Sequence, residues 1–123
     1  MDTDVLIDLE RKHPPADAWF AALPHLPAIP GFAAMELLNG SRSQSDRLLI
    51  ETFLRPFSIV WPTEADMDRA LRKYTPLRLS DGLGLIDALI AATAVGRGEA
   101  LLTFKVKHYR AVPGLAIHQP YIR

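Results

Sequence analysis

Apolar and polar residues alternate along the chain in blocks that predict short helices separated by short strands. Apolar residues at helical spacing predict helices over residues 15–23, 33–39, 43–54, 63–74 and 85–95. Short apolar runs predict extended segments or strands over residues 26–32, 57–61, 100–104 and 115–118. Residues 3–9 are typical of a strand end that continues into a helix. Residues 75–84 are expected to form a loop, and residues 105–114 an irregular or short helical stretch.

This alternation predicts an α/β fold with three layers, in which helices cover both faces of a mainly parallel central sheet. No repeat, low-complexity tract or linker interrupts the 123 residues, so a single domain over residues 1–123 is expected. Ligand sites in such sheets form at the carboxyl ends of strands. Polar residues that directly follow strands are therefore the candidates for a functional site.

The composition narrows the possible chemistry. The chain contains no cysteine, which excludes disulfides, thiolate zinc sites and a cysteine nucleophile. Hydrophobic residues make up 49% of the chain, enough for a core, but no apolar run reaches the roughly 18 residues of a membrane span. The acidic start is unlike a secretory signal, so we expect a cytoplasmic protein without membrane association.

Four acids lie in apolar surroundings, where a lone carboxylate is costly to bury. Asp2 and Asp4 precede an apolar run, Glu36 lies between Met35 and Leu37, and Asp87 lies in the most apolar helix. Each has an ordinary alternative: a helix cap for Asp2 or Asp4, an exposed stripe for Glu36, and an outward-facing or helix-start position for Asp87. If the acids converge after strands, they need a cation, and oxygen ligands without histidine or cysteine select Mg²⁺ or Mn²⁺.

Four segments resemble the PIN-domain family in order and spacing. Asp2-Thr-Asp-Val-Leu-Ile7 resembles its opening, Ala34-Met-Glu-Leu-Leu-Asn-Gly40 its second acidic segment, and Leu85-Ile-Asp-Ala-Leu-Ile-Ala-Ala-Thr-Ala94 its third. Residues 101–115 resemble its closing strand and loop. The likeness covers nearly the whole chain and is strongest to the toxin half of VapBC-type toxin–antitoxin pairs.

The resemblance implies a magnesium-dependent endoribonuclease that cleaves RNA with activated water. It implies Asp2, Glu36 and Asp87 as metal ligands, with Thr103 helping to hold the site or the phosphate, and Asp4 as a secondary acid. A small antitoxin and a homodimeric state are the partners it implies. The local excess of basic residues after Arg97 makes Lys105, Lys107 and Arg110 candidates for contact with RNA.

Two positions depart from the family pattern. Lys105 stands where the family usually has Asn or Asp, so its ammonium would compete with a metal ion or bind a substrate phosphate. We therefore expect weaker metal binding, with a single ion. Only Met1 precedes the first aspartate, where the family has several apolar residues; this predicts a truncated first strand or a natural start farther upstream.

Three other readings compete. Asp2-Thr-Asp-Val5 fits the nucleophile motif of haloacid-dehalogenase-type phosphatases, but Glu99 is the only acid after Asp87, where that mechanism needs a late acidic pair. A phospho-receiver domain would need an aspartate after the strand at 57–61, and Pro62 follows it instead. A non-catalytic PIN relative that binds RNA or protein is the third, because Lys105 would weaken metal chemistry.

Overall fold

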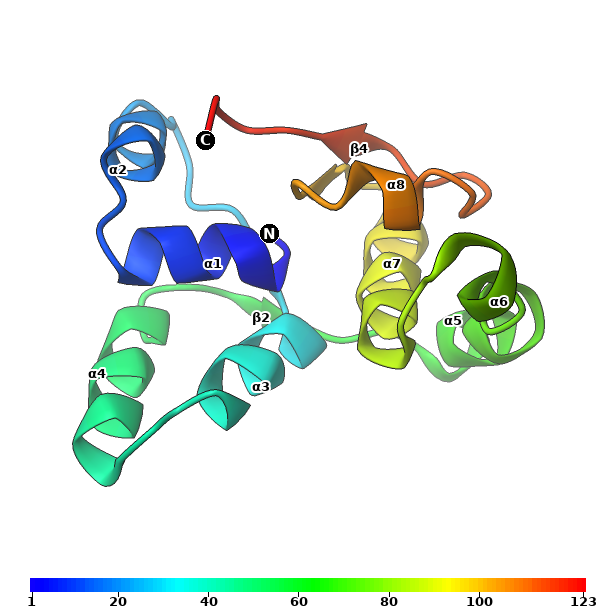
Figure 1. Ribbon diagram of the computed structural model, residues 1–123, viewed down its shortest axis with the longest axis horizontal. Helices are drawn as coiled ribbons and strands as arrows, with labels where there is room; N and C mark the ends of the chain where they lie inside the picture. The colour runs from blue at the N-terminus through cyan, green and yellow to red at the C-terminus, as the bar shows by residue number, and fades with distance from the viewer.

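The computed structural model describes all residues from Met1 to Arg123. Its elements, in chain order, are α1 (Thr3–Glu10), α2 (Pro14–Ala21), β1 (Ile29–Pro30), α3 (Gly31–Asn39), α4 (Gln44–Leu54), β2 (Ile59–Val60), α5 (Glu64–Arg69), the π-helix η1 (Ala70–Tyr74), α6 (Leu77–Asp81), α7 (Leu85–Arg97), β3 (Leu101–Leu102), α8 (Val106–Tyr109) and β4 (Ile117–His118). Figure 1 shows α1 to α4 in one half and α5 to α7 in the other, with β4 and α8 alongside α7.

The strands form two parallel pairs. In the first pair, Ile29 of β1 lies opposite Ile59 of β2. In the second, Leu101 of β3 lies opposite Ile117 of β4. Helices connect the strands within the first pair, as parallel strands require a crossover connection. The predicted α/β fold with parallel strands is thus confirmed, although each strand is shorter than its apolar run suggested.

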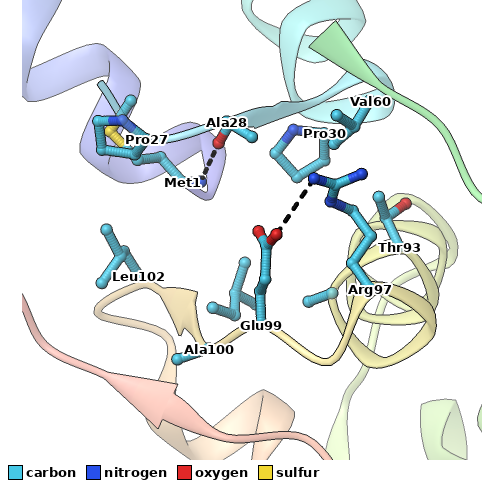
Figure 2. Close-up of a pocket in the computed structure, with 12 residues that line it drawn as sticks. Met1, Pro27, Ala28, Pro30, Val60, Thr93, Arg97, Glu99, Ala100 and Leu102 are labelled. Atoms are coloured by element: carbon cyan, nitrogen blue, oxygen red, sulfur yellow. Dashed lines mark hydrogen bonds and ion pairs between the residues drawn. The ribbon is translucent and has the colours of Figure 1, made fainter. Parts of the chain in front are cut away.

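Met1 and Asp2 bridge the two strand pairs. The Met1 ammonium donates a hydrogen bond of 3.1 Å to the carbonyl of Ala28, beside β1 (Figure 2). The backbone N–H of Asp2 donates one of 2.9 Å to the carbonyl of Leu102 in β3. Two residues therefore hold the position that the first strand would take. Burial lowers the pKa of the Met1 amine to about 6.

A pocket of about 100 Å³ lies between the strand pairs, next to Met1. Pro30 and Val60 line it from one pair and Leu102 from the other, while Arg97 reaches it from α7 (Figure 2). Because only Met1 and Asp2 lie between the two strand pairs, the space between these pairs is incompletely filled.

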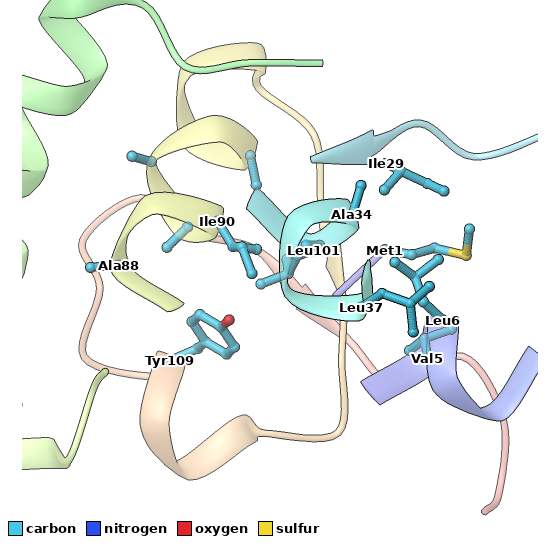
Figure 3. Packing of buried hydrophobic residues seen from close by; sticks show 14 of the residues in the cluster. Met1, Val5, Leu6, Ile29, Ala34, Leu37, Ala88, Ile90, Leu101 and Tyr109 are labelled. Carbon is cyan, nitrogen blue, oxygen red and sulfur yellow. The ribbon is translucent and has the colours of Figure 1, made fainter. Parts of the chain in front are cut away.

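Helix α7 is at the centre of the core. Ile90, Ala91 and Ala92 are completely buried, and α7 contacts α3, α5, η1 and β1. Helix α3 packs against α7, and Figure 3 shows Leu37 of α3 beside Val5 and Leu6 of α1. The small side chains of both helices allow close approach, and burying their apolar surface stabilises the fold by roughly 25 cal/mol per Å². Gly98 ends α7 in the left-handed conformation, at φ +66°.

Two of the elements predicted from the sequence differ from the structure: the loop over residues 75–84 and the end of the helix over residues 63–74. Residues 75–84 contain the helix α6, which has no buried residue and therefore no apolar periodicity by which to predict it. The helix predicted over 63–74 changes to π geometry from Ala70 onward. This helix begins with a capping box, in which Thr63 and Asp66 each accept the other's backbone N–H. No helix in the structure combines the length and apolar character that crossing a membrane requires.

Candidate metal centre

Asp2, Glu36 and Asp87 converge at one point of the fold. Asp2 follows Met1 and caps α1, Glu36 lies on α3 directly after β1, and Asp87 lies in the first turn of α7. Each offers a carboxylate oxygen, and these oxygens lie within 4.8 Å of one another. Asp2 and Asp87 are buried and Glu36 is partly exposed, so the cluster is open on the Glu36 side.

Two donors fix the Asp2 carboxylate. Its Oδ1 accepts the backbone N–H of Thr3 at 2.8 Å, and its Oδ2 accepts the Thr103 hydroxyl at 2.8 Å. Burial, and then the nearby charge of Asp4, raise the pKa of Asp2 to about 6. The ionised carboxylate is thus costly here unless a cation compensates it.

Thr3 also orients Glu36. Its hydroxyl donates to Glu36 Oε1 at 2.5 Å, so a single residue contacts two of the three carboxylates. We assigned no role to Thr3 from the sequence. Its position next to Asp2, at the start of a helix, was the available signal.

Asp87 is held from the opposite side by α8. Its Oδ1 accepts the Tyr109 hydroxyl at 3.2 Å and the Lys105 ammonium at 3.3 Å. Tyr109 is completely buried, and burial raises the pKa of its phenol, which stays a donor at neutral pH. The sequence analysis missed Tyr109. Tyr109 and Val112, three residues apart and both buried, carry the apolar spacing that could have indicated a buried face there.

The donor set fits a hard divalent ion. The hydrogen bonds to Glu36 reach Oε1 and those to Asp87 reach Oδ1, which leaves Oε2 and Oδ2 for a ligand. The three residues offer carboxylate oxygens alone, which suits Mg²⁺ or Mn²⁺ rather than zinc. The outer donors fix the carboxylates in direction, as second-sphere partners of metal ligands do.

Asp4 takes a different position from the three converging acids. Its Oδ2 accepts the backbone N–H of Phe104 at 2.9 Å and lies 3.4 Å from the Thr103 hydroxyl. It therefore supports the turn after β3. Thr103 is completely buried and also accepts the backbone N–H of Lys105 at 3.1 Å.

The basic residues after β3 occupy two environments. Lys105 reaches into the cluster: burial lowers the pKa of its ammonium, but the attraction of Asp2 and Asp87 outweighs this and leaves the pKa raised. Lys107 and Arg110 lie exposed on and after α8, and neither forms an ion pair. A surface groove of about 650 Å³ adjoins the cluster through Glu36, with Arg11 and Arg42 on its walls.

The sequence profile described as "PIN domain" matches residues 1–112. The chain belongs to the PIN domain family. This membership decides against the phosphatase and phospho-receiver readings, and it agrees with an α/β fold in which acids meet beside parallel strands. No curated protein matches the sequence.

Three solved structures resemble nearly the whole chain. A toxin–antitoxin complex from Klebsiella pneumoniae is 29% identical, with a TM-score of 0.76, and the match covers 99% of this chain and 97% of that one. VapBC2 from Rickettsia felis, bound to a DNA fragment from its promoter, is 23% identical, with a TM-score of 0.76 and coverage of 95% and 94%. VapBC-1 from nontypeable Haemophilus influenzae is 23% identical, with a TM-score of 0.75 and coverage of 97% and 95%. The last two support the fold alone.

Proposed function

We propose that this PIN-domain protein is a divalent-metal-dependent endoribonuclease and the toxin of a toxin–antitoxin pair. The observation that carries the proposal is the convergence of three carboxylate oxygens within 4.8 Å, each carboxylate oriented by its own donors. Three carboxylates this close repel one another strongly unless a cation joins them. Membership of the PIN family and the likeness to a toxin–antitoxin complex support the reaction class.

Different residues of the candidate site would have different roles. Asp2, Glu36 and Asp87 would hold Mg²⁺ or Mn²⁺, which supplies acidity for a water molecule and positive charge for the phosphate. Thr3, Thr103 and Tyr109 keep the carboxylates in place, so little reorganisation precedes the reaction. Lys107 and Arg110, unpaired and exposed beside the cluster, would contact backbone phosphates of the RNA.

The groove beside Glu36 would receive the RNA strand. It opens directly onto a proposed metal ligand, and the side chains of Arg11 and Arg42 form no ion pair in the structure.

Exposed apolar side chains, including Trp61, Met67 and Leu71, would be covered by the antitoxin or a second copy. We place this activity in the cytoplasm and in one domain that spans residues 1–123.

The decisive experiment is RNA cleavage by the purified protein, freed of any antitoxin. Total RNA is incubated with Mg²⁺, with Mn²⁺ and with EDTA, using the wild type, Asp87→Asn and the matched control Asp68→Asn. Asp68 carries the same charge but is exposed on α5. We expect metal-dependent cleavage that Asp87→Asn loses and Asp68→Asn keeps. A folded wild type that binds RNA without cleaving it would favour the catalytically inactive binding module, a reading suggested by the Lys105 contact with Asp87.

A further inference from the structure

The ammonium of Lys105 lies against the carboxylate cluster, with its side chain partly exposed. Its ammonium is 3.3 Å from Asp87 Oδ1, and Asp2, Asp87 and Glu36 all attract it. Its backbone is anchored as well, because the N–H of Lys105 donates to the Thr103 hydroxyl that also holds Asp2. The structure therefore places one positive charge among the three acids before any ion binds.

The charge balance of the cluster limits what else it can hold. Asp4 already accepts the backbone N–H groups of Val5 and Phe104, so the count is made for the three ligand acids. When ionised, these carry three negative charges, and the Lys105 ammonium leaves two. One divalent ion makes the group neutral. A second ion would leave two excess positive charges. The repulsion between the ions would be strong, because two-ion sites place them about 3.5–4 Å apart and partly buried charges are weakly screened.

The hydrogen bonds leave room for both cations on different oxygens. Tyr109 and Lys105 occupy Asp87 Oδ1, and Thr3 occupies Glu36 Oε1. Oδ2 of Asp87 and Oε2 of Glu36 receive no hydrogen bond. An ion that binds these free oxygens therefore does not need to displace the ammonium from Oδ1.

We propose that Lys105 is the second cation of this site: its ammonium stays on Asp87 while Asp2, Glu36 and Asp87 hold one divalent ion. This rests on the proposed metal-dependent function. On this proposal Lys105 replaces a second ion without displacing the first, although its positive charge lowers the affinity of the site for that first ion. The metal-free protein is then stabilised by Lys105, which compensates carboxylates that would otherwise stand unpaired.

Counting bound Mn²⁺ by titration calorimetry and electron paramagnetic resonance tests the proposal. The variants are Lys105→Asp and the control Lys107→Asp, which makes the same charge change at an exposed neighbour. We expect one ion in the wild type and in Lys107→Asp, and two in Lys105→Asp, which exchanges the ammonium for another oxygen ligand. Lys105→Asn, the milder change, should bind Mn²⁺ roughly tenfold more tightly or better. Circular dichroism checks that each variant is folded.

The outcomes separate this proposal from the proposed function. Two ions in the wild type would overturn the role of Lys105 but leave the nuclease standing. Unchanged stoichiometry in Lys105→Asp together with unchanged affinity in Lys105→Asn would do the same. A wild type that binds no Mn²⁺ and cleaves no RNA would overturn both.

Discussion

The Thr103 hydroxyl lies 2.8 Å from Asp2 Oδ2, although 101 residues separate the two in the chain. The Thr103 hydroxyl oxygen also accepts the backbone N–H of Lys105 at 3.1 Å. One buried side chain thus joins the end of β3 to the segment that bridges the sheet. It fixes an acid and a base of the candidate site relative to each other.

Thr103→Val should lower the free energy of unfolding by about 1–3 kcal/mol, because it leaves Asp2 and the Lys105 N–H without their partner in a buried place. Urea denaturation in EDTA measures the change. Thr93→Val is the matched control: Thr93 is equally buried, but its hydroxyl donates to Leu89 of its own helix. Equal losses in both variants would show that the link to Asp2 adds nothing.

The metal-free protein should lose stability as Asp2 ionises. The pKa of Asp2 is about 6 in the folded protein against an ordinary value of 3.8, so the folded state binds the proton more tightly. Its contribution is complete below pH 4 and is lost as the pH rises through 6, by roughly 3 kcal/mol. Asp2→Asn should lack this loss, and Mg²⁺ should reverse it in the wild type.

Unfolding in EDTA at pH 4, 5, 6 and 7.5 tests this slope. The Met1 amine titrates in the opposite sense, since its contribution is present above pH 8 and is lost as the pH falls through 6. Because both proteins carry Met1, the difference between wild type and Asp2→Asn cancels the Met1 contribution except for the part of the Met1 pKa that comes from the Asp2 charge. A constant difference across the four pH values would contradict the prediction.

Gly96→Ala should destabilise the protein by about 1–3 kcal/mol, even though alanine favours helices by about 1 kcal/mol. A methyl group at Gly96 would collide with the Asp66 carboxylate. That carboxylate accepts the Thr63 N–H at 2.9 Å and the Arg69 guanidinium at 3.0 Å. Gly40→Ala, whose methyl group would be no closer than 3.5 Å to its neighbours, serves as control in thermal unfolding. A Gly96→Ala protein as stable as Gly40→Ala would refute the collision.

Arg123→Ala should cost about 1 kcal/mol, more than an exposed ion pair normally contributes. The Arg123 Nε lies 3.1 Å from Asp8 Oδ2, and the guanidinium lies 5.0 Å from the centre of the Phe104 ring. Arg72→Ala removes a fully exposed pair with Asp68 and should change stability little. Chemical denaturation measures the stability of both variants. Equal losses would count against a contribution from the contact between Arg123 and Phe104.

Features that depend on neighbouring residues could be predicted from the sequence. Asp87 attracted notice because apolar residues surround it, and the capping box at Thr63 is likewise a local feature, since it involves residues three positions apart. The helix at 85–95 was predictable because its apolar run is long. Apolar surroundings drew attention to four acids, and the resemblance to PIN domains singled out three of them as metal ligands. The fold class followed from the alternation of elements.

Contacts between distant residues could not be predicted in the same way. The contacts of Asp87 with Tyr109 and of Asp8 with Arg123 join positions 22 and 115 residues apart. A pattern within one window says nothing about such pairs. Asp8 does lie among Val5, Leu6 and Leu9, so the criterion that selected Asp87 would also have selected Asp8; its partners would still have been unknown. The hydrogen bond from Met1 to Ala28 could not be predicted either, because it also joins residues that are far apart in the chain.

The bridge made by Met1 bears on how the protein should be handled. The Met1 ammonium donates to Ala28 and the next residue is a proposed metal ligand, so a fusion tag at Met1 would replace this ammonium and alter the segment that carries Asp2. Arg123 is bound to Asp8, which makes the other end a poor place as well. The exposed turn at Pro113 and Gly114 is a better position for an affinity label or a fluorophore, because both ends then keep their contacts.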